Sequence, residues 1–197
     1  MKTALIVVDI QNDFCPGGAL AVAEGDQVVQ PSNRLIGQFR RHGAPIFYTR
    51  DWHPAKHSSF KAHGGPWPPH CVQGTPGAQF HRDLDLPEDA IIMNKAWQTE
   101  SEDFSGKSSS ELFSRLSQAR VQRVVLVGLA TEYCIKATAH DARAAGFEVI
   151  VITDAIRPVK VRPGDEQRAL DDMRARGCAL LTSAEFLATY PALAAQA

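Results

Sequence analysis

Four reactive side chains stand where predicted strands end. Asp9 ends the first strand, Asp51 ends the second, Lys95 follows the third, and Cys134 lies just after the fourth at the start of a helix. Ligands of open α/β sheets bind outside the carboxyl ends of the strands, so we expect these groups to meet in one crevice. A lone aspartate at a strand end is more often a helix cap or a loop hydrogen-bond partner. Their convergence instead favours nucleophilic catalysis.

Cys134 is the candidate nucleophile. It occupies the first turn after the string Gly128-Leu129-Ala130-Thr131, where free backbone N–H groups and the helix dipole favour a thiolate over a thiol. Such N–H groups can also hold an oxyanion, at roughly 3 kcal/mol per donor. Lys95 would lower the pKa of the thiol, and Asp9 would accept its proton and pass it to a leaving group. The competing interpretation is a partly buried structural ion pair.

The remaining cysteines have plainer interpretations. Cys178 is expected to be a small buried residue, while Cys15 and Cys71 lie in loops and lack a helix start. The chain has no C-x-x-C and no dense cysteine pattern, so we expect reduced thiols. The N-terminus has five apolar residues before Asp9, too few for a secretory signal, and we expect a cytoplasmic protein.

A metal site is predicted between residues 51 and 77. Asp51 and His53 point the same way in an extended chain, and His57, His63 and His70 follow. A carboxylate with imidazoles suits Zn, Fe or Mn. On spacing alone, surface histidines in a proline-rich loop are about as common an explanation.

The sequence alternates short apolar runs with stretches of helical periodicity. This alternation predicts an α/β fold with a parallel six-stranded sheet and helices on both faces. The predicted strands are Ala4–Asp9, Pro45–Arg50, Ala90–Met93, Arg123–Leu129, Glu148–Thr153 and Ala179–Leu181. The predicted helices are Pro31–His42, Ser110–Ala119, Glu132–Ala145, Asp165–Arg176 and Ala184–Tyr190. Gly43, Gly146 and Gly177 follow three of them, as helix C-caps do.

Length, composition and charge exclude several classes of protein. The 197 residues favour one domain, 1–197, and the 44% hydrophobic content provides a real core. The net charge of −1 shows no excess of basic residues, which nucleic-acid binders use to contact phosphates, so we expect no nucleic-acid partner. The longest apolar runs are far shorter than the ~20 residues of a membrane-spanning helix. Trp52, Trp67 and Trp97 fall near the expected crevice and could form an aromatic slot for a flat ring, although core packing explains any one of them.

Four strings resemble the nicotinamidase/pyrazinamidase group of the isochorismatase-like cysteine hydrolases. They are Val7-Val8-Asp9-Ile10-Gln11-Asn12-Asp13-Phe14, Asp51-Trp52-His53-Pro54, Trp67-Pro68-Pro69-His70-Cys71 and Gly128-Leu129-Ala130-Thr131-Glu132-Tyr133-Cys134. The resemblance runs from the first predicted strand through the fifth. It implies an isochorismatase-like fold with Rossmann-like layering.

The resemblance also implies roles for individual residues. Asp9, Lys95 and Cys134 would form the catalytic triad, and Ala130 and Cys134 would give the oxyanion N–H groups beside a cis peptide between Leu129 and Ala130. Asp51, His53 and His70 would bind one divalent metal, zinc first, with iron or manganese as alternatives. Phe14 and Trp67 would sandwich the pyridine ring. His57, a fourth ligand in some relatives, is left off the ligand set.

The implied reaction is hydrolysis of nicotinamide to nicotinate and ammonia through a thioester, within NAD salvage, with pyrazinamide as a further substrate. Glu132 stands where the family usually has Asp, and Ala96 stands where Gly is common. The alternatives are an amidase for another small amide and a non-catalytic metal- or ligand-binding relative. Isochorismatases lack the cysteine, and the carbamoylsarcosine amidase type lacks the metal ligands. A homo-oligomer is compatible with the sequence.

Overall fold

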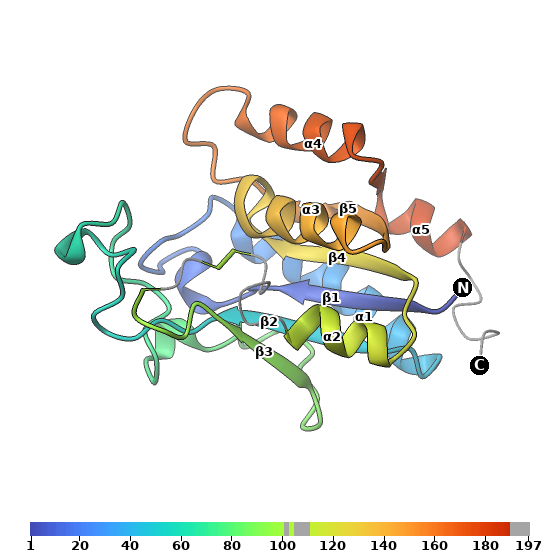
Figure 1. Ribbon diagram of the computed structural model, residues 1–197, viewed down its shortest axis with the longest axis horizontal. Coiled ribbons are helices and arrows are strands. Elements are labelled where there is room, and N and C mark those ends of the chain that lie inside the picture. Colours follow the sequence, from blue (N-terminus) through green and yellow to red (C-terminus); the bar gives the residue numbers. More distant parts are fainter. Residues whose placement is uncertain (101–102, 105–110, 190–197) are drawn as a thin grey trace.

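One parallel sheet organises the chain. The computed structural model describes residues 1–100, 103–104 and 111–189, and its six strands lie in the order β3-β2-β1-β4-β5-β6 (Figure 1). The strands are β1 Thr3–Val8, β2 Ile46–Asp51, β3 Ile91–Lys95, β4 Arg123–Leu129, β5 Glu148–Arg157 and β6 Ala179–Leu181. The chain winds outward from β1 in both directions, and the helices that follow β1 and β4 cover opposite faces of the sheet. Open α/β sheets bind ligands at such a point, at the carboxyl ends of the strands.

Helices cover both faces of the sheet, as predicted (Figure 1). They are α1 Val29–Arg41, α2 Glu111–Gln118, α3 Lys136–Ala144, α4 Asp165–Ala175 and α5 Ser183–Thr189. Side chains of α1 and α5 share one buried cluster, while those of α2, α3 and α4 share the other. Among the described residues, no helix has both the length and the apolar character needed to cross a bilayer.

The residues of β1 show why two cores form. Leu5 and Val7 belong to the cluster under α1 and α5, whereas Ala4, Ile6 and Val8 belong to the opposite cluster. All five are fully buried. A central parallel strand is covered on both faces, so it is apolar throughout rather than alternating.

The predicted elements are confirmed within a few residues, and the structure differs from the prediction in three places. Helix α1 begins at Val29 and not at Pro31, since a proline in the first turn gives up an N–H that has no helical partner. Strand β5 runs past Thr153 to Arg157, because the pairing shifts register between Leu126 and Gly128 and then continues. The helix that carries Cys134 begins as a π-type turn, Thr131–Ile135, before α3. The predicted ends at Ser110 and Tyr190 lie outside the described residues.

Gly128 permits the close approach of β4 to β1 beside the crevice. Its φ is +119°, and a Cβ built on it would lie 1.9 Å from the carbonyl oxygen of Val8. Only glycine fits there without moving one of the two central strands. The residues that follow, up to Cys134, are thereby held next to the end of β1, where Asp9 stands.

Candidate active site

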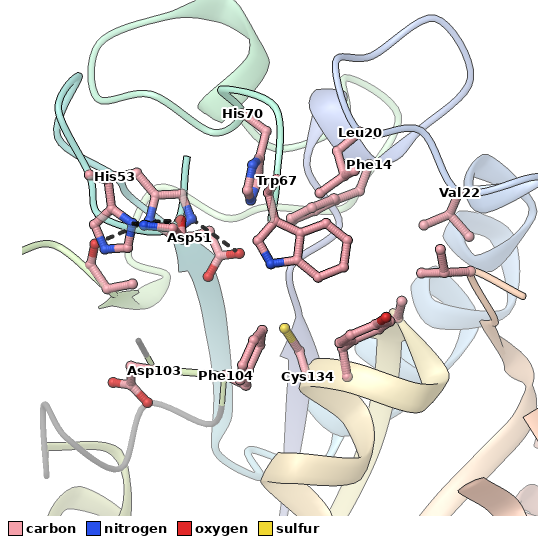
Figure 2. A pocket seen from close by; sticks show the side chains of 16 residues that line it. Phe14, Leu20, Val22, Asp51, His53, Trp67, His70, Asp103, Phe104 and Cys134 are labelled. Carbon is pink, nitrogen blue, oxygen red and sulfur yellow. Dashed lines mark hydrogen bonds and ion pairs between the residues drawn. The ribbon is translucent and has the colours of Figure 1, made fainter. Parts of the chain in front are cut away.

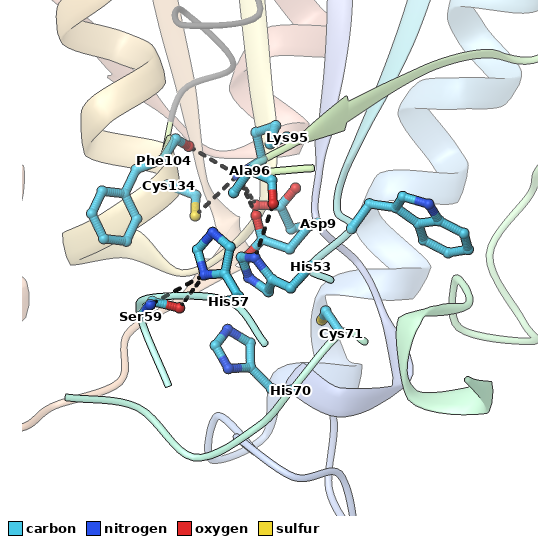
Figure 3. A network of polar contacts seen from close by, with 12 residues as sticks. Asp9, His53, His57, Ser59, His70, Cys71, Lys95, Ala96, Phe104 and Cys134 are labelled. Atoms are coloured by element: carbon cyan, nitrogen blue, oxygen red, sulfur yellow. Dashed lines mark hydrogen bonds and ion pairs between the residues drawn. The ribbon is translucent and has the colours of Figure 1, made fainter. Parts of the chain in front are cut away.

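Lys95 is the centre of a buried polar cluster at the ends of the strands (Figure 3). Its Nζ lies 2.6 Å from Asp9 Oδ2 and 3.1 Å from Asp51 Oδ1, and it donates to Cys134 Sγ at 3.3 Å. It also donates to the Phe104 carbonyl at 3.0 Å. The four side chains that end β1, β2 and β3 or follow β4 therefore meet, as predicted from their positions.

The Asp9 carboxylate lies beside the Cys134 thiol. One carboxylate oxygen of Asp9 and the Cys134 sulfur belong to a group of atoms that all lie within 4.8 Å of one another. Thr49 Oγ1 donates to the other oxygen, Oδ1, at 2.7 Å. Both Asp9 and Lys95 are fully buried. Fixed in this way, Asp9 has few other proton partners than Cys134 and Lys95.

Burial and the neighbouring charges together set the pKa values of this cluster. Burial raises the pKa of Asp9 to about 6, against the attraction of Lys95. Burial alone would lower the pKa of Lys95, but the carboxylates of Asp51 and Asp9 outweigh it and hold that pKa well above its ordinary value. Burial would likewise raise the pKa of Asp51, yet Lys95 and His53 keep it below its ordinary value. At neutral pH the cluster holds two carboxylates around one ammonium.

The thiolate expected at Cys134 is not favoured in the resting protein. Burial raises the pKa of the Cys134 thiol well above its ordinary value, and Asp9 and Asp51 add to it, while Lys95 opposes them. The helix start and the single lysine are outweighed because burial and two neighbouring carboxylates act in the opposite direction. The proton therefore stays on sulfur until a base removes it, and Asp9 is the neighbouring base.

Asp51, His53 and His70 come together as a trio suited to a metal. One ligand atom from each lies within 4.8 Å of the others, and all three residues are buried. His53 Nδ1 donates to the Ala96 carbonyl at 3.3 Å, and His70 Nδ1 donates to the Pro68 carbonyl at 2.8 Å. A histidine that gives its Nδ1 proton to a carbonyl leaves Nε2 as a metal ligand.

The other histidines of this region are placed differently. His57 is buried beside His53, with their ring centroids 4.3 Å apart, and its Nδ1 lies 2.7 Å from Ser59 Oγ. Among the described residues, the group whose ligand atoms all lie within 4.8 Å of one another contains Asp51, His53 and His70 but not His57. His63 is exposed on a short 3-10 turn. Three of the four histidines of this segment therefore line the pocket, and two of them join Asp51 in the compact trio.

A pocket opens between the histidines and an apolar wall (Figure 2). The Cys134 sulfur points into it, with Asp51, His53 and His70 toward one end and Val22 toward the other. Its lining is Phe14, Leu20, Val22, Asp51, His53, His57, Ser59, Trp67, His70, Ala96, Asp103, Phe104, Ala130, Tyr133, Cys134 and Val159. Such an apolar pocket with a few polar groups at one end suits a small flat molecule.

Only one of the three tryptophans considered for an aromatic slot lines this pocket. Trp67 does so, in edge contact with Tyr133 at 5.3 Å between ring centroids, and Phe14 also lines the pocket. Trp97 is 51% exposed, and Trp52 packs under the guanidinium of Arg50 at 3.8 Å. The idea of a three-tryptophan slot is therefore wrong, because both other rings lie outside the pocket lining.

The turn before Cys134 has the features implied for an oxyanion site. The peptide between Leu129 and Ala130 is cis, as expected. Ala130 and Cys134 both line the pocket, and the Ala130 carbonyl accepts from the N–H groups of Tyr133 and Ile135, which starts the helical turn.

The other cysteines are also buried, Cys178 as predicted.

Two polar residues with structural roles were not recognised from the sequence. The side chain of Gln11 bonds the main chain of Asp51, and Asp13 Oδ2 accepts from the N–H of Cys71 at 2.7 Å, next to His70. Both follow Asp9 at alternate positions, and that period-two run of polar residues after a buried strand was the available signal. Residues 9–13 thus contact both the nucleophile and the ligand-bearing segments.

Comparisons with known proteins agree with this geometry. The model of the isochorismatase domain matches residues 3–185. The chain is 37% identical to a nicotinamidase of Escherichia coli over 93% of this chain and 96% of that protein. It is similar to the pyrazinamidase of Pyrococcus horikoshii in complex with zinc, with 49% identity, a TM-score of 0.88, and coverage of 92% of this chain and 99% of that one. It is also similar to PnC1 of L. infantum in complex with nicotinate, with 34% identity, a TM-score of 0.86, and coverage of 93% and 94%.

Proposed function

The chain belongs to the isochorismatase family, and we propose that it is a nicotinamidase that hydrolyses nicotinamide to nicotinate and ammonia. The observation that carries the proposal is the Cys134 thiol pointing into a ring-sized apolar pocket within reach of Lys95 and Asp9. The E. coli relative bears the same activity in its name, and the P. horikoshii relative is a pyrazinamidase. Pyrazinamide, a ring of the same size with the same amide, is the second substrate we propose.

The first half of the reaction uses the cluster around Lys95. Cys134 Sγ attacks the amide carbonyl carbon, forming an S–C bond, while Asp9 takes the thiol proton. The N–H groups of Ala130 and Cys134 hold the resulting oxyanion. Asp9 then gives the proton to the amide nitrogen, the C–N bond breaks, and ammonia leaves a thioester on Cys134. Lys95 keeps Asp9 ionised before the attack and fixes it beside the sulfur.

The second half consumes water. Asp9, again a carboxylate, takes a proton from a water molecule that attacks the thioester carbonyl. The oxyanion returns to the same N–H groups, the C–S bond breaks, and the thiolate of Cys134 recovers the proton from Asp9. Nicotinate leaves, and the sum is one amide and one water converted to one acid and one ammonia.

One divalent metal is proposed on Asp51, His53 and His70. The fit rests on the chemistry of the donor set, a carboxylate with two imidazoles whose Nδ1 atoms are already engaged by carbonyls. Zinc is the first candidate because such ligands suit it, and iron and manganese are the alternatives. When bound, the metal supplies positive charge at this end of the pocket, suited to anchoring a pyridine nitrogen directly or through water.

Phe14 and Trp67 are proposed to hold the substrate ring. Both line the pocket above the Cys134 sulfur in Figure 2, and aromatic side chains give a flat ring large contact area at low entropic cost. Ring placement between them leaves the amide over the sulfur. A cytoplasmic location is proposed alongside, in keeping with four free cysteines.

The deciding experiment measures ammonia release from nicotinamide by the purified protein, with a chelator and after metal is added back. Fast release that stops with the chelator and returns with the metal is expected. No release from nicotinamide, with release from another small amide, would replace the substrate and keep the reaction class. No release from any amide, with ligand still bound, would leave a non-catalytic binding protein.

A further inference from the structure

The carboxylate of Glu132 ties two distant parts of the chain together. Its Oε2 accepts from the main-chain N–H of Val159 and its Oε1 from that of Lys160, both at 2.9 Å. Hydrogen bonds to an ionised acceptor are stronger than neutral ones, and a pair of them fixes direction as well as distance. One side chain therefore fixes the start of the loop that joins β5 to α4.

This connection joins a turn that carries pocket residues to a loop residue that lines the pocket. Glu132 lies in the helical turn Thr131–Ile135, two residues before Cys134. Val159 lines the pocket and packs against the core beside α1 and α5. The chain turns sharply just after it, since Lys160 has a φ of +59°. The position of Val159 relative to the nucleophile thus depends on Glu132.

Val159 is one of several aliphatic side chains in the lining. Val22 and Leu20 line the same pocket and belong to or pack against the same buried cluster, and Val22 lies at the end away from His53 (Figure 2). An apolar wall of this kind discriminates among substrates by size, because an extra methyl group must either fill free space or displace the wall. A wall built partly on a loop discriminates only as far as the loop is held in place.

We propose that Glu132 is a positioning residue that fixes Val159 in the pocket wall and so limits the size of ring substituents that the enzyme accepts. The inference rests on the proposed function for its choice of substrates. The substrate class it defines is the unsubstituted aromatic carboxamide, with ring-methylated carboxamides excluded. Glu132 accepts hydrogen bonds from the loop, and not from Cys134 or the Asp51, His53 and His70 trio. We therefore expect it to affect substrate binding rather than the attack on the amide.

The test compares nicotinamide with 5-methylnicotinamide in three variants. Glu132→Gln keeps one acceptor oxygen and replaces the other with a donor that faces an N–H, so the loop is released. Its KM for nicotinamide is expected to rise about five- to tenfold with kcat within about twofold, and its preference for nicotinamide over the methylated ring to fall by roughly tenfold. Val159→Ala should lower the same preference by trimming the wall. Glu132→Asp, which keeps both acceptor oxygens, should recover part of it.

A matched control lies in the first turn of α4, where the loop ends. Glu166→Gln removes an equal charge from a carboxylate that lies 3.4 Å from Lys160 Nζ. The main-chain N–H groups of Val159 and Lys160 donate to Glu132 instead. Its kinetics should equal those of the wild type. Hydrogen exchange of the peptide spanning 157–164 should speed up in Glu132→Gln alone. An unchanged preference and unchanged exchange in Glu132→Gln would overturn the inference.

These readouts separate the inference from the proposed function. Wild-type protein that releases no ammonia from nicotinamide contradicts the proposed function, and the exchange of residues 157–164 then still decides whether Glu132 holds the loop. Wild-type protein that turns over nicotinamide, with a Glu132→Gln variant that loses kcat and leaves KM and preference unchanged, refutes the positioning role alone.

Discussion

The side-chain amide of Gln11 is paired with the main chain of Asp51. Gln11 Oε1 accepts the Asp51 N–H at 2.8 Å, and Gln11 Nε2 donates to the Asp51 carbonyl at 2.8 Å. Nε2 also donates to the Ala78 carbonyl at 2.9 Å, and the side chain is fully buried. Asp51 is thus fixed at the end of β2 by a residue that follows the neighbouring strand β1.

Gln11→Ala should weaken the metal site from outside the ligand set. Removing the side chain leaves three buried main-chain groups without these bonds, at a cost of roughly 2–3 kcal/mol in the free energy of unfolding. The metal dissociation constant should rise at least about tenfold, as for other residues that orient ligands. Competition with a chromogenic chelator measures it. Gln73→Ala is the control and should retain wild-type affinity for the metal. In the wild type, Gln73 Nε2 donates to the carbonyls of Trp52 and Trp97 on the surface.

Cys134→Ala should abolish turnover and spare the fold. Without the sulfur no thioester forms, and ammonia release should fall by at least about a thousandfold, with thermal stability and metal content retained. The control is Cys178→Ala, a buried cysteine in the core beside α2, α3 and α4, which should keep its activity. Near-normal ammonia release by Cys134→Ala would refute the assignment of the nucleophile.

Activity should fall on the acid side as Asp9 is protonated. Burial raises the pKa of Asp9 to about 6, and a carboxylic acid below its pKa is neutral and cannot take the thiol proton. We therefore expect log(kcat/KM) to be level near pH 7 and to drop with a slope of about one below pH 6. The profile is measured at saturating metal, with bound metal quantified at each pH. A level profile down to pH 4.5 at constant metal content would exclude this role.

His53→Ala should lose metal and bind nicotinamide weakly. The variant removes one of the three proposed ligands, whose atoms lie within 4.8 Å of one another. Bound metal, measured by elemental analysis, should fall below one tenth of the wild-type content and KM should rise by about tenfold or more, since the ring loses its anchor. His63→Ala is the matched control, an exposed histidine of the same loop. An unchanged KM after metal loss would contradict the anchoring role.

Ala96→Gly should stabilise the protein. Ala96 has a φ of +46°, a region that costs an L-residue roughly 1–2 kcal/mol, part of which is offset by the entropy of glycine in the unfolded chain. A net gain of about 0.5–1 kcal/mol corresponds to an increase of about 1–4 °C in Tm, read by calorimetry. Arg120→Gly, at φ +54° in an exposed turn, should gain a similar amount. A lower Tm for Ala96→Gly would mean that the methyl contacts outweigh the backbone strain.

The layers of the fold, and the end of the sheet where the reactive side chains meet, follow from the sequence. Apolar runs such as 4–8 and 124–130 are typical of buried parallel strands, and side chains that follow such strands share one edge of the sheet. Strand and helix limits followed from proline, glycine and periodicity. These are local properties, which nearest neighbours along the chain decide.

Which groups touch depends on tertiary packing. Spacing alone does not separate Trp67 from Trp97, yet one lines the pocket and the other is half exposed, because burial depends on packing between distant segments. The direction of the Cys134 pKa shift depends on packing too, since burial by the surrounding chain opposes the lysine and the helix start. The pairing of Glu132 with Val159 and Lys160 joins residues 27 and 28 positions apart, a relationship that no local pattern encodes.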